Sequence, residues 1–65
     1  MRINKTKVEL IMADKDITKK EVCEKANNMP YATLNNAMKG KEITIQTCGR
    51  IARALEVKSK DIIQD

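Results

Sequence analysis

The break at Asn27 and Asn28 constrains the fold of this chain more than any other feature of its sequence, because a short helix pattern lies on each side of it. Before the break, Thr18 is a favourable N-cap and Glu21 stands three residues later, as in a capping box. Asparagine tolerates the left-handed backbone that ends a helix. Pro30 then suits the first turn of a second helix, where its missing N–H leaves no bond unmade. The sequence therefore predicts two short helices joined by a tight turn.

The second helix of the pair, predicted over residues 31–39, has two unlike faces. At about 100° per residue, Leu34, Ala37 and Met38 share its inner side. Gly40 follows as the C′ residue that stops the helix. The outer side carries short side chains and one lysine: Ala32, Asn36 and Lys39, flanked by Thr33 and Asn35.

The outer face of this helix is uncharged apart from its lysine, and no acidic residue occurs between Lys25 and Lys41. A solvated helix normally mixes both signs of charge, so this pattern favours a polyanion as the partner. Short side chains also let a helix backbone approach base edges in the major groove of DNA. The alternative is that these asparagines and threonines are ordinary surface residues, and this face alone leaves both interpretations open.

The chain is expected to form one domain over residues 1–65, with 42% apolar residues to supply a modest core. Its net charge of +4 gives a mild bias towards anionic partners. Tyr31 is the one aromatic residue, which argues against a stacking platform for single-stranded nucleic acid. Neither a signal peptide nor a run of membrane-spanning length is present, so a soluble cytoplasmic protein with no membrane partner is expected.

The residue types present give little support to catalysis or metal binding. The chain has no histidine, no Gly-rich phosphate loop and no nucleophile paired with a base, so it is not predicted to be an enzyme. Its two cysteines, Cys23 and Cys48, form no CxxC motif, and a zinc site would need about four ligands. Both thiols are therefore predicted to be buried and reduced. No metal, cofactor or small-molecule ligand is expected.

Helices are also predicted on both sides of this pair. Asn4 or Thr6 can start a first helix that reaches about Ala13, after three N-terminal residues that are expected to be loose. Ser59 is the expected cap of a final short helix, in which Ile62 faces inwards.

Residues 41–47 are ambiguous, because they alternate with period two and are rich in β-branched side chains, like an edge strand. The apolar residues from Ile45 onwards recur at helical spacing instead, and Thr44 is a plausible N-cap. We favour a helix over residues 45–55, within which Gly49 would allow close helix packing. Five short helices with brief polar links then predict an all-α bundle.

The order of these parts resembles the Cro/C1-type helix-turn-helix family (XRE-like) of phage and bacterial repressors. The likeness rests on the segments ITKKEVCEKA, TLNNAMKGK and RIARALEVKSKDII, which stand in the family's order and close to its spacing. It extends from about Val8 to Ile63. The resemblance implies a compact five-helix bundle of the lambda-repressor-like type, with the helix-turn-helix at helices two and three.

The resemblance also implies a sequence-specific transcriptional regulator, a repressor that binds a double-stranded DNA operator with its third helix in the major groove. Base reading would fall to Tyr31, Ala32, Thr33, Asn35 and Asn36. Phosphate contacts would fall to Thr18, Lys19, Lys20, Lys39 and Lys41. One small domain offers few base contacts, so a homodimer on a palindromic site is expected, for which exposed Ile43, Ile45 or Ile63 would be candidate contacts.

The sequence departs from the family pattern at a buried ion pair. Many relatives pair an arginine on helix one with a glutamate late in helix three, and the matching positions here are Met12 and Met38. Because both partners are replaced, neither is left as an unpaired buried charge. We interpret this departure as a swap that preserves the fold.

Two other departures concern the DNA contacts. The segment between Ala26 and Leu34 is one residue longer than the common pattern, which leaves the register of Tyr31 and Ala32 open by one position. The loop that begins at Glu42 carries no lysine or arginine, although relatives often send a basic side chain from it to the minor groove. These features favour an alternative function, a protein-binding module on the same fold, such as an anti-repressor or an antitoxin-like partner.

Overall fold

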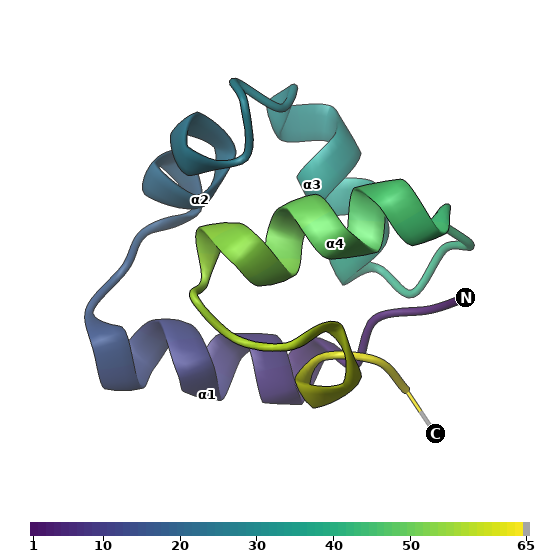
Figure 1. Cartoon of the computed structure of the whole chain (residues 1–65), viewed down its shortest axis with the longest axis horizontal. Helices are drawn as coiled ribbons and strands as arrows, with labels where there is room; N and C mark the ends of the chain where they lie inside the picture. Colours follow the sequence, from purple (N-terminus) through teal and green to yellow (C-terminus); the bar gives the residue numbers. More distant parts are fainter. Residues whose placement is uncertain (65) are drawn as a thin grey trace.

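The computed structural model describes residues 1–64 as four α-helices and one 3-10 helix (Figure 1). The elements are α1 Lys5–Lys15, α2 Lys19–Lys25, α3 Tyr31–Met38, α4 Ile45–Ala54 and the 3-10 helix η1 Ser59–Asp61. The all-α class is confirmed, but the predicted count of five α-helices is wrong, because residues 59–61 form only a 3-10 turn. Asp65, the last residue of the predicted domain, lies outside the described residues. None of the helices in the described part is long and apolar enough to cross a membrane.

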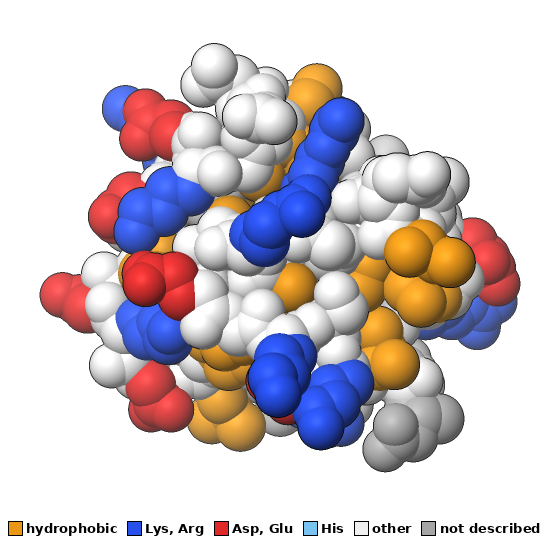
Figure 2. Space-filling view, viewed as in Figure 1, with side chains coloured by type: hydrophobic (Ala, Val, Ile, Leu, Met, Phe, Trp, Pro, Cys, Tyr) orange, Lys and Arg blue, Asp and Glu red, His pale blue; other side chains and the backbone are white. Residues whose placement is uncertain are grey.

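The helices enclose one core. In Figure 1, α1 lies along the bottom, α4 crosses the middle, and α2 and α3 lie above it. On the face in Figure 2, side chains of both charge signs surround small separate hydrophobic patches. The predicted inner faces are confirmed, since the buried set includes Val8, Val22, Cys23, Ala26, Leu34, Ala37, Met38, Cys48, Ile51 and Ile62.

The helix starts follow from local sequence. Asn4, Thr18 and Thr44 each accept a hydrogen bond, through a side-chain oxygen, from the third backbone amide of their helix at 3.0 to 3.2 Å. At Thr18 the capping box is complete, because Glu21 Oε1 accepts from the Thr18 amide at 3.2 Å. The same sequence places α4 at Ile45, so the helix interpretation of this region is confirmed over the strand.

Removing the Thr18 hydroxyl should weaken the start of α2. We expect Thr18→Ala to lower the free energy of unfolding by about 1 kcal/mol, which is a fall in melting temperature of about 4–8 °C for a domain of this size. Thr18→Ser keeps the capping oxygen and is the matched control. Thermal unfolding followed by circular dichroism measures both variants, and equal melting of Thr18→Ala and the unmodified protein would contradict the prediction.

Three helices end through the same left-handed motif. Asp16, Gly40 and Glu56 have φ of 53°, 86° and 59°. In each case the amide of the following residue reaches a carbonyl five residues earlier, at 2.9 to 3.3 Å, which is a Schellman bond. The stop at Gly40 confirms the prediction. The predicted end of α1 near Ala13 is wrong, because the helix continues to Lys15.

The expectation that residues 1–3 are loose is also wrong. Ile3 is only 1% exposed and forms an antiparallel bridge with Ile63. Backbone hydrogen bonds of 2.8 and 2.9 Å flank the bridge, so the two ends of the described chain lie together (Figure 1). The Met1 carbonyl also accepts from the Ile43 amide at 2.9 Å. The N-terminal segment thereby secures the loop before α4.

Two smaller expectations fail as well. A Cβ built on Gly49 would meet no atom within 4 Å, so close packing does not require glycine there. The N-cap of η1 is Lys58 rather than Ser59, which is the first residue inside the turn.

Both cysteines are buried and free, as predicted. Burial raises the pKa of the Cys23 thiol, and the neighbouring Glu24 carboxylate adds to the shift. The thiol is therefore held in its protonated, unreactive form. The described residues contain no group of three or more His, Cys, Asp or Glu side chains placed to hold a metal ion.

Candidate nucleic-acid interface

The turn between α2 and α3 is built by its asparagines and one buried methionine. Asn27 and Asn28 have φ of 61° and 56°, so the predicted left-handed break is confirmed. The Met29 side chain is only 6% exposed, and its amide donates to the Cys23 carbonyl at 2.9 Å. Pro30 was predicted to lie in the first turn of α3, but it is the N-cap, one residue before the helix begins. Met29 thus anchors an otherwise exposed turn between α2 and α3 in the core.

The outer face of α3 is bare. Ala32 and Asn36 are exposed, and Tyr31 is 52% exposed at the start of the helix. Thr33 and Asn35 are half-buried at its sides. Of the five predicted base-reading residues, Ala32 and Asn36 thus form the outward side of α3, Thr33 and Asn35 flank it, and Tyr31 lies at its start.

The two asparagine amides of α3 differ in their hydrogen bonding. The ammonium of Lys19, at the start of α2, donates to Asn35 Oδ1 at 3.3 Å. An ammonium only donates, so this bond uses one of the two acceptor positions of the Asn35 oxygen and none of the N–H groups of its amide. Within residues 1–64, the Asn36 side chain makes no hydrogen bond. Asn36 therefore offers both a donor and an acceptor.

Among the residues predicted to bind phosphate, two already make hydrogen bonds within the protein and three have no ion-pair partner among residues 1–64. The Thr18 hydroxyl accepts from the Glu21 amide and donates to Glu21 Oε1, both at 3.2 Å, so its hydrogen is used inside the capping box. Lys19 is half-buried and engaged with α3, as described above. Three exposed lysines have no ion-pair partner in the described part of the chain: Lys20, Lys39 and Lys41.

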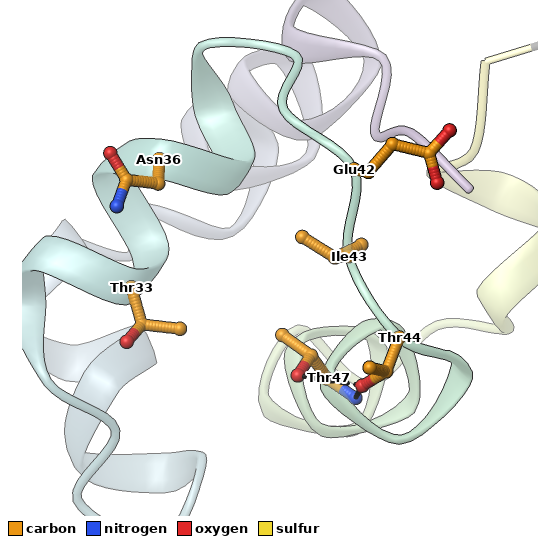
Figure 3. A pocket seen from close by; sticks show the side chains of 6 residues that line it. All are labelled: Thr33, Asn36, Glu42, Ile43, Thr44 and Thr47. Carbon is orange, nitrogen blue, oxygen red and sulfur yellow. Dashed lines mark hydrogen bonds between the residues drawn. The ribbon is translucent and has the colours of Figure 1, made fainter.

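A hollow of about 460 Å³ lies between α3 and the start of α4 (Figure 3). Thr33 and Asn36 line it from α3, and Thr47 lines it from α4. The loop before α4 supplies its other lining residues, Glu42, Ile43 and Thr44. Sequence reasoning did not place Thr44 and Thr47 at this site, because their spacing signalled only a helix cap.

Glu42 is the acidic residue closest in sequence to the α3 face. Its carboxylate accepts from the α-ammonium of Met1 at 3.0 Å and turns away from α3 in Figure 3. This hydrogen bond, and the positive charge of the same ammonium, hold the pKa of the Glu42 carboxyl below its usual value. An acidic group thus borders the hollow, but its charge is matched by the N-terminal segment.

Among the candidate dimer contacts, Ile43 and Ile63 are half-buried and pack against the core, whereas Ile45 is 75% exposed. Ile45 is therefore the one of the three that is available to a partner.

The comparisons with known proteins identify a family. No curated protein and no solved structure matches the chain. One family model, that of the Cro/C1-type HTH DNA-binding domain, matches residues 7–65. The matched residues include α2, the turn, α3 with its bare outer face, and α4. The chain therefore belongs to the Cro/C1-type HTH DNA-binding domain family.

Proposed function

We propose that this protein is a sequence-specific transcriptional repressor that binds double-stranded DNA with α3 in the major groove. The observation that carries the proposal is the outer face of α3, where Ala32 and Asn36 are exposed. No acidic residue interrupts the sequence from Lys25 to Lys41 around them. A rigid helix with short side chains and flanking positive charge fits the width and potential of the groove.

Base reading would come from side chains that differ in what they offer. The Asn36 amide has the donor and acceptor that bidentate contact with adenine requires. The Asn35 NH₂ group, with its oxygen held by Lys19, suits an acceptor such as a purine N7 or a thymine O4. The methyl groups of Ala32 and Thr33 suit the thymine methyl, and Tyr31 stands at the end of the row. We therefore expect A·T pairs at the centre of each half-site.

Phosphate contacts would set the position of α3 on the duplex. The exposed candidates are Lys20, in the first turn of α2, and Lys39 and Lys41, which directly follow α3. Thr18 and Lys19 lie at the start of α2, and Lys19 would share its ammonium between Asn35 and a phosphate.

A homodimer acting in the cytoplasm would double the base contacts. Its half-sites would lie about 34 Å apart on one face of the duplex. The exposed Ile45 side chain, at the start of α4, is the apolar group that supports such a contact.

The salt dependence of duplex binding tests this function. The probe is a duplex selected from a randomised pool by the unmodified protein, and its affinity should fall steeply with salt. Lys39→Ala should lower the slope of log K against log[salt] by about one, because one phosphate contact is lost. Lys60→Ala removes the same charge from η1, on another element, and should leave the slope unchanged. Equal slopes for both variants would place Lys39 outside the interface.

The alternative function is a protein-binding module on this fold. The loop that begins at Glu42 favours it, because this loop borders the hollow beside α3 and carries no lysine or arginine to contact a phosphate. Duplex binding that is undetectable, or insensitive to salt, would support this alternative and contradict the repressor.

A further inference from the structure

A second hollow, of about 200 Å³, lies between the end of α2 and the second half of α4. It shares no residue with the predicted DNA contacts. Ala26, only 3% exposed, is its buried member. The other lining side chains are Lys25, Asn27, Arg50 and Arg53.

These lining side chains are almost entirely donors. Lys25, Arg50 and Arg53 carry three positive charges, and none of them forms an ion pair or hydrogen bond within residues 1–64. Ammonium and guanidinium groups cannot accept hydrogen bonds. The Asn27 amide adds one further donor group and the only side-chain acceptor of the lining. The hollow therefore has positive charge and hydrogen-bond donors without a matching anion.

Favourable interactions with helix dipoles explain the positions of only two of the three cations. Lys25 and Arg53 lie in the last turns of α2 and α4, where a cation interacts favourably with the helix dipole. Arg50 lies one turn earlier on the same side of α4 as Arg53, and like charges three residues apart repel. Neither Glu24 nor Glu56, the nearest acids in sequence, pairs with them. Within residues 1–64, no ion pair or hydrogen bond of the Arg50 side chain accounts for its place at this hollow.

We propose that this hollow binds an oxyanion of the phosphate class, either a free phosphate or phosphomonoester or a phosphate of a nucleic-acid backbone. Two guanidinium groups from one helix face can each donate paired N–H bonds to phosphate oxygens. The Lys25 ammonium and the Asn27 amide close the other side from α2. The volume admits a phosphate group but is below the roughly 300 Å³ of sites that enclose drug-sized ligands. This site does not depend on whether α3 binds DNA.

Titration of the full chain with inorganic phosphate tests the site. The measurement is two-dimensional ¹H–¹⁵N NMR near neutral pH, with sodium chloride replaced so that ionic strength stays constant. Shifts should saturate in the millimolar range and concentrate on the Ala26 and Asn27 amides and the Arg50 and Arg53 side-chain N–H groups. The Arg50→Gln, Arg53→Gln double variant should weaken binding about tenfold, since each exposed charge pair contributes about two- to fivefold.

The matched control is Lys5→Gln with Lys60→Gln, which removes two exposed charges elsewhere and should leave phosphate binding unchanged. Thermal melts check that both double variants fold. Two results would contradict the site. One is chemical shift changes that rise linearly with phosphate concentration and spread over all lysines. The other is equal phosphate binding by the arginine variant and the unmodified protein. A duplex titration then identifies the source of the anion. A salt slope lower by about two in the arginine variant indicates a backbone phosphate, and an unchanged slope indicates a free oxyanion.

Discussion

Met38→Glu should abolish cooperative unfolding near room temperature. Met38 is 4% exposed on the inner side of α3, so a carboxylate there would be buried without a partner. An uncompensated buried charge costs about 3–5 kcal/mol, and a domain of this size is stable by only a few kcal/mol. Urea unfolding followed by circular dichroism measures the loss. Ala32→Glu places the same charge on the exposed face of the same helix and should melt close to the unmodified protein.

The effect of Met38→Glu should depend on pH and on position 12. Burial raises the pKa of a carboxyl, so the native state of the variant binds its proton more tightly and should regain stability as pH falls to about 5. Adding Met12→Arg should restore much of the loss near neutral pH, because many relatives pair an arginine and a glutamate at these two positions and Met12 is half-buried against the same core. A double variant no more stable than Met38→Glu would show that the two methionines do not face each other. Normal melting of Met38→Glu would show that α3 is not held in the core.

Helix starts and inner faces could be predicted because their signals are local. A capping side chain bonds its own helix three residues later, as Thr18 and Thr44 do, and apolar spacing marks the buried side. The outer face of α3 follows from the same periodicity. These features need no knowledge of what the rest of the chain does.

The features that could not be predicted arise from contacts between distant residues or from unusual turn residues. Asp16 and Glu56 adopt the left-handed conformation that glycine usually supplies, so the sequence did not predict the Schellman motif at those helix ends. The bridge between Ile3 and Ile63 joins opposite ends of the sequence. The hydrogen bond from Lys19 to Asn35 depends on how α2 and α3 pack. Both hollows likewise form only where separate elements meet.

The contrast between Asn35 and Asn36 illustrates what packing adds to the candidate site. These two residues are adjacent in sequence, and the family motif assigns both of them to base reading. In the structure the Asn35 oxygen accepts a hydrogen bond from Lys19, whereas the whole amide of Asn36 is unpaired among the described residues. If α3 enters the groove, the two positions should therefore recognise different base edges.

Replacing Asn36 with alanine should remove discrimination at one A·T pair of the selected site. A bidentate contact is worth about 1–3 kcal/mol against the wrong base, which is about 5- to 150-fold in relative affinity. Competition between the selected duplex and duplexes substituted at single positions measures this ratio. Gln46→Ala removes an exposed amide from α4 rather than α3 and should keep the preference intact.

If α3 occupies the major groove, Asn36→Ala should reduce the specificity of DNA binding, whereas Lys39→Ala should reduce its affinity. The asparagine variant should bind the selected and the substituted duplex almost equally, with its salt slope unchanged, because no charge is lost. The lysine variant should bind every duplex more weakly while keeping the ratio between them. Asn35→Ala should relax a different base pair from Asn36→Ala, since Lys19 already donates to the Asn35 oxygen whereas both groups of the Asn36 amide have no partner within residues 1–64. Unaltered discrimination in both asparagine variants would mean that another surface reads the sequence, and that α3 does not lie in the groove.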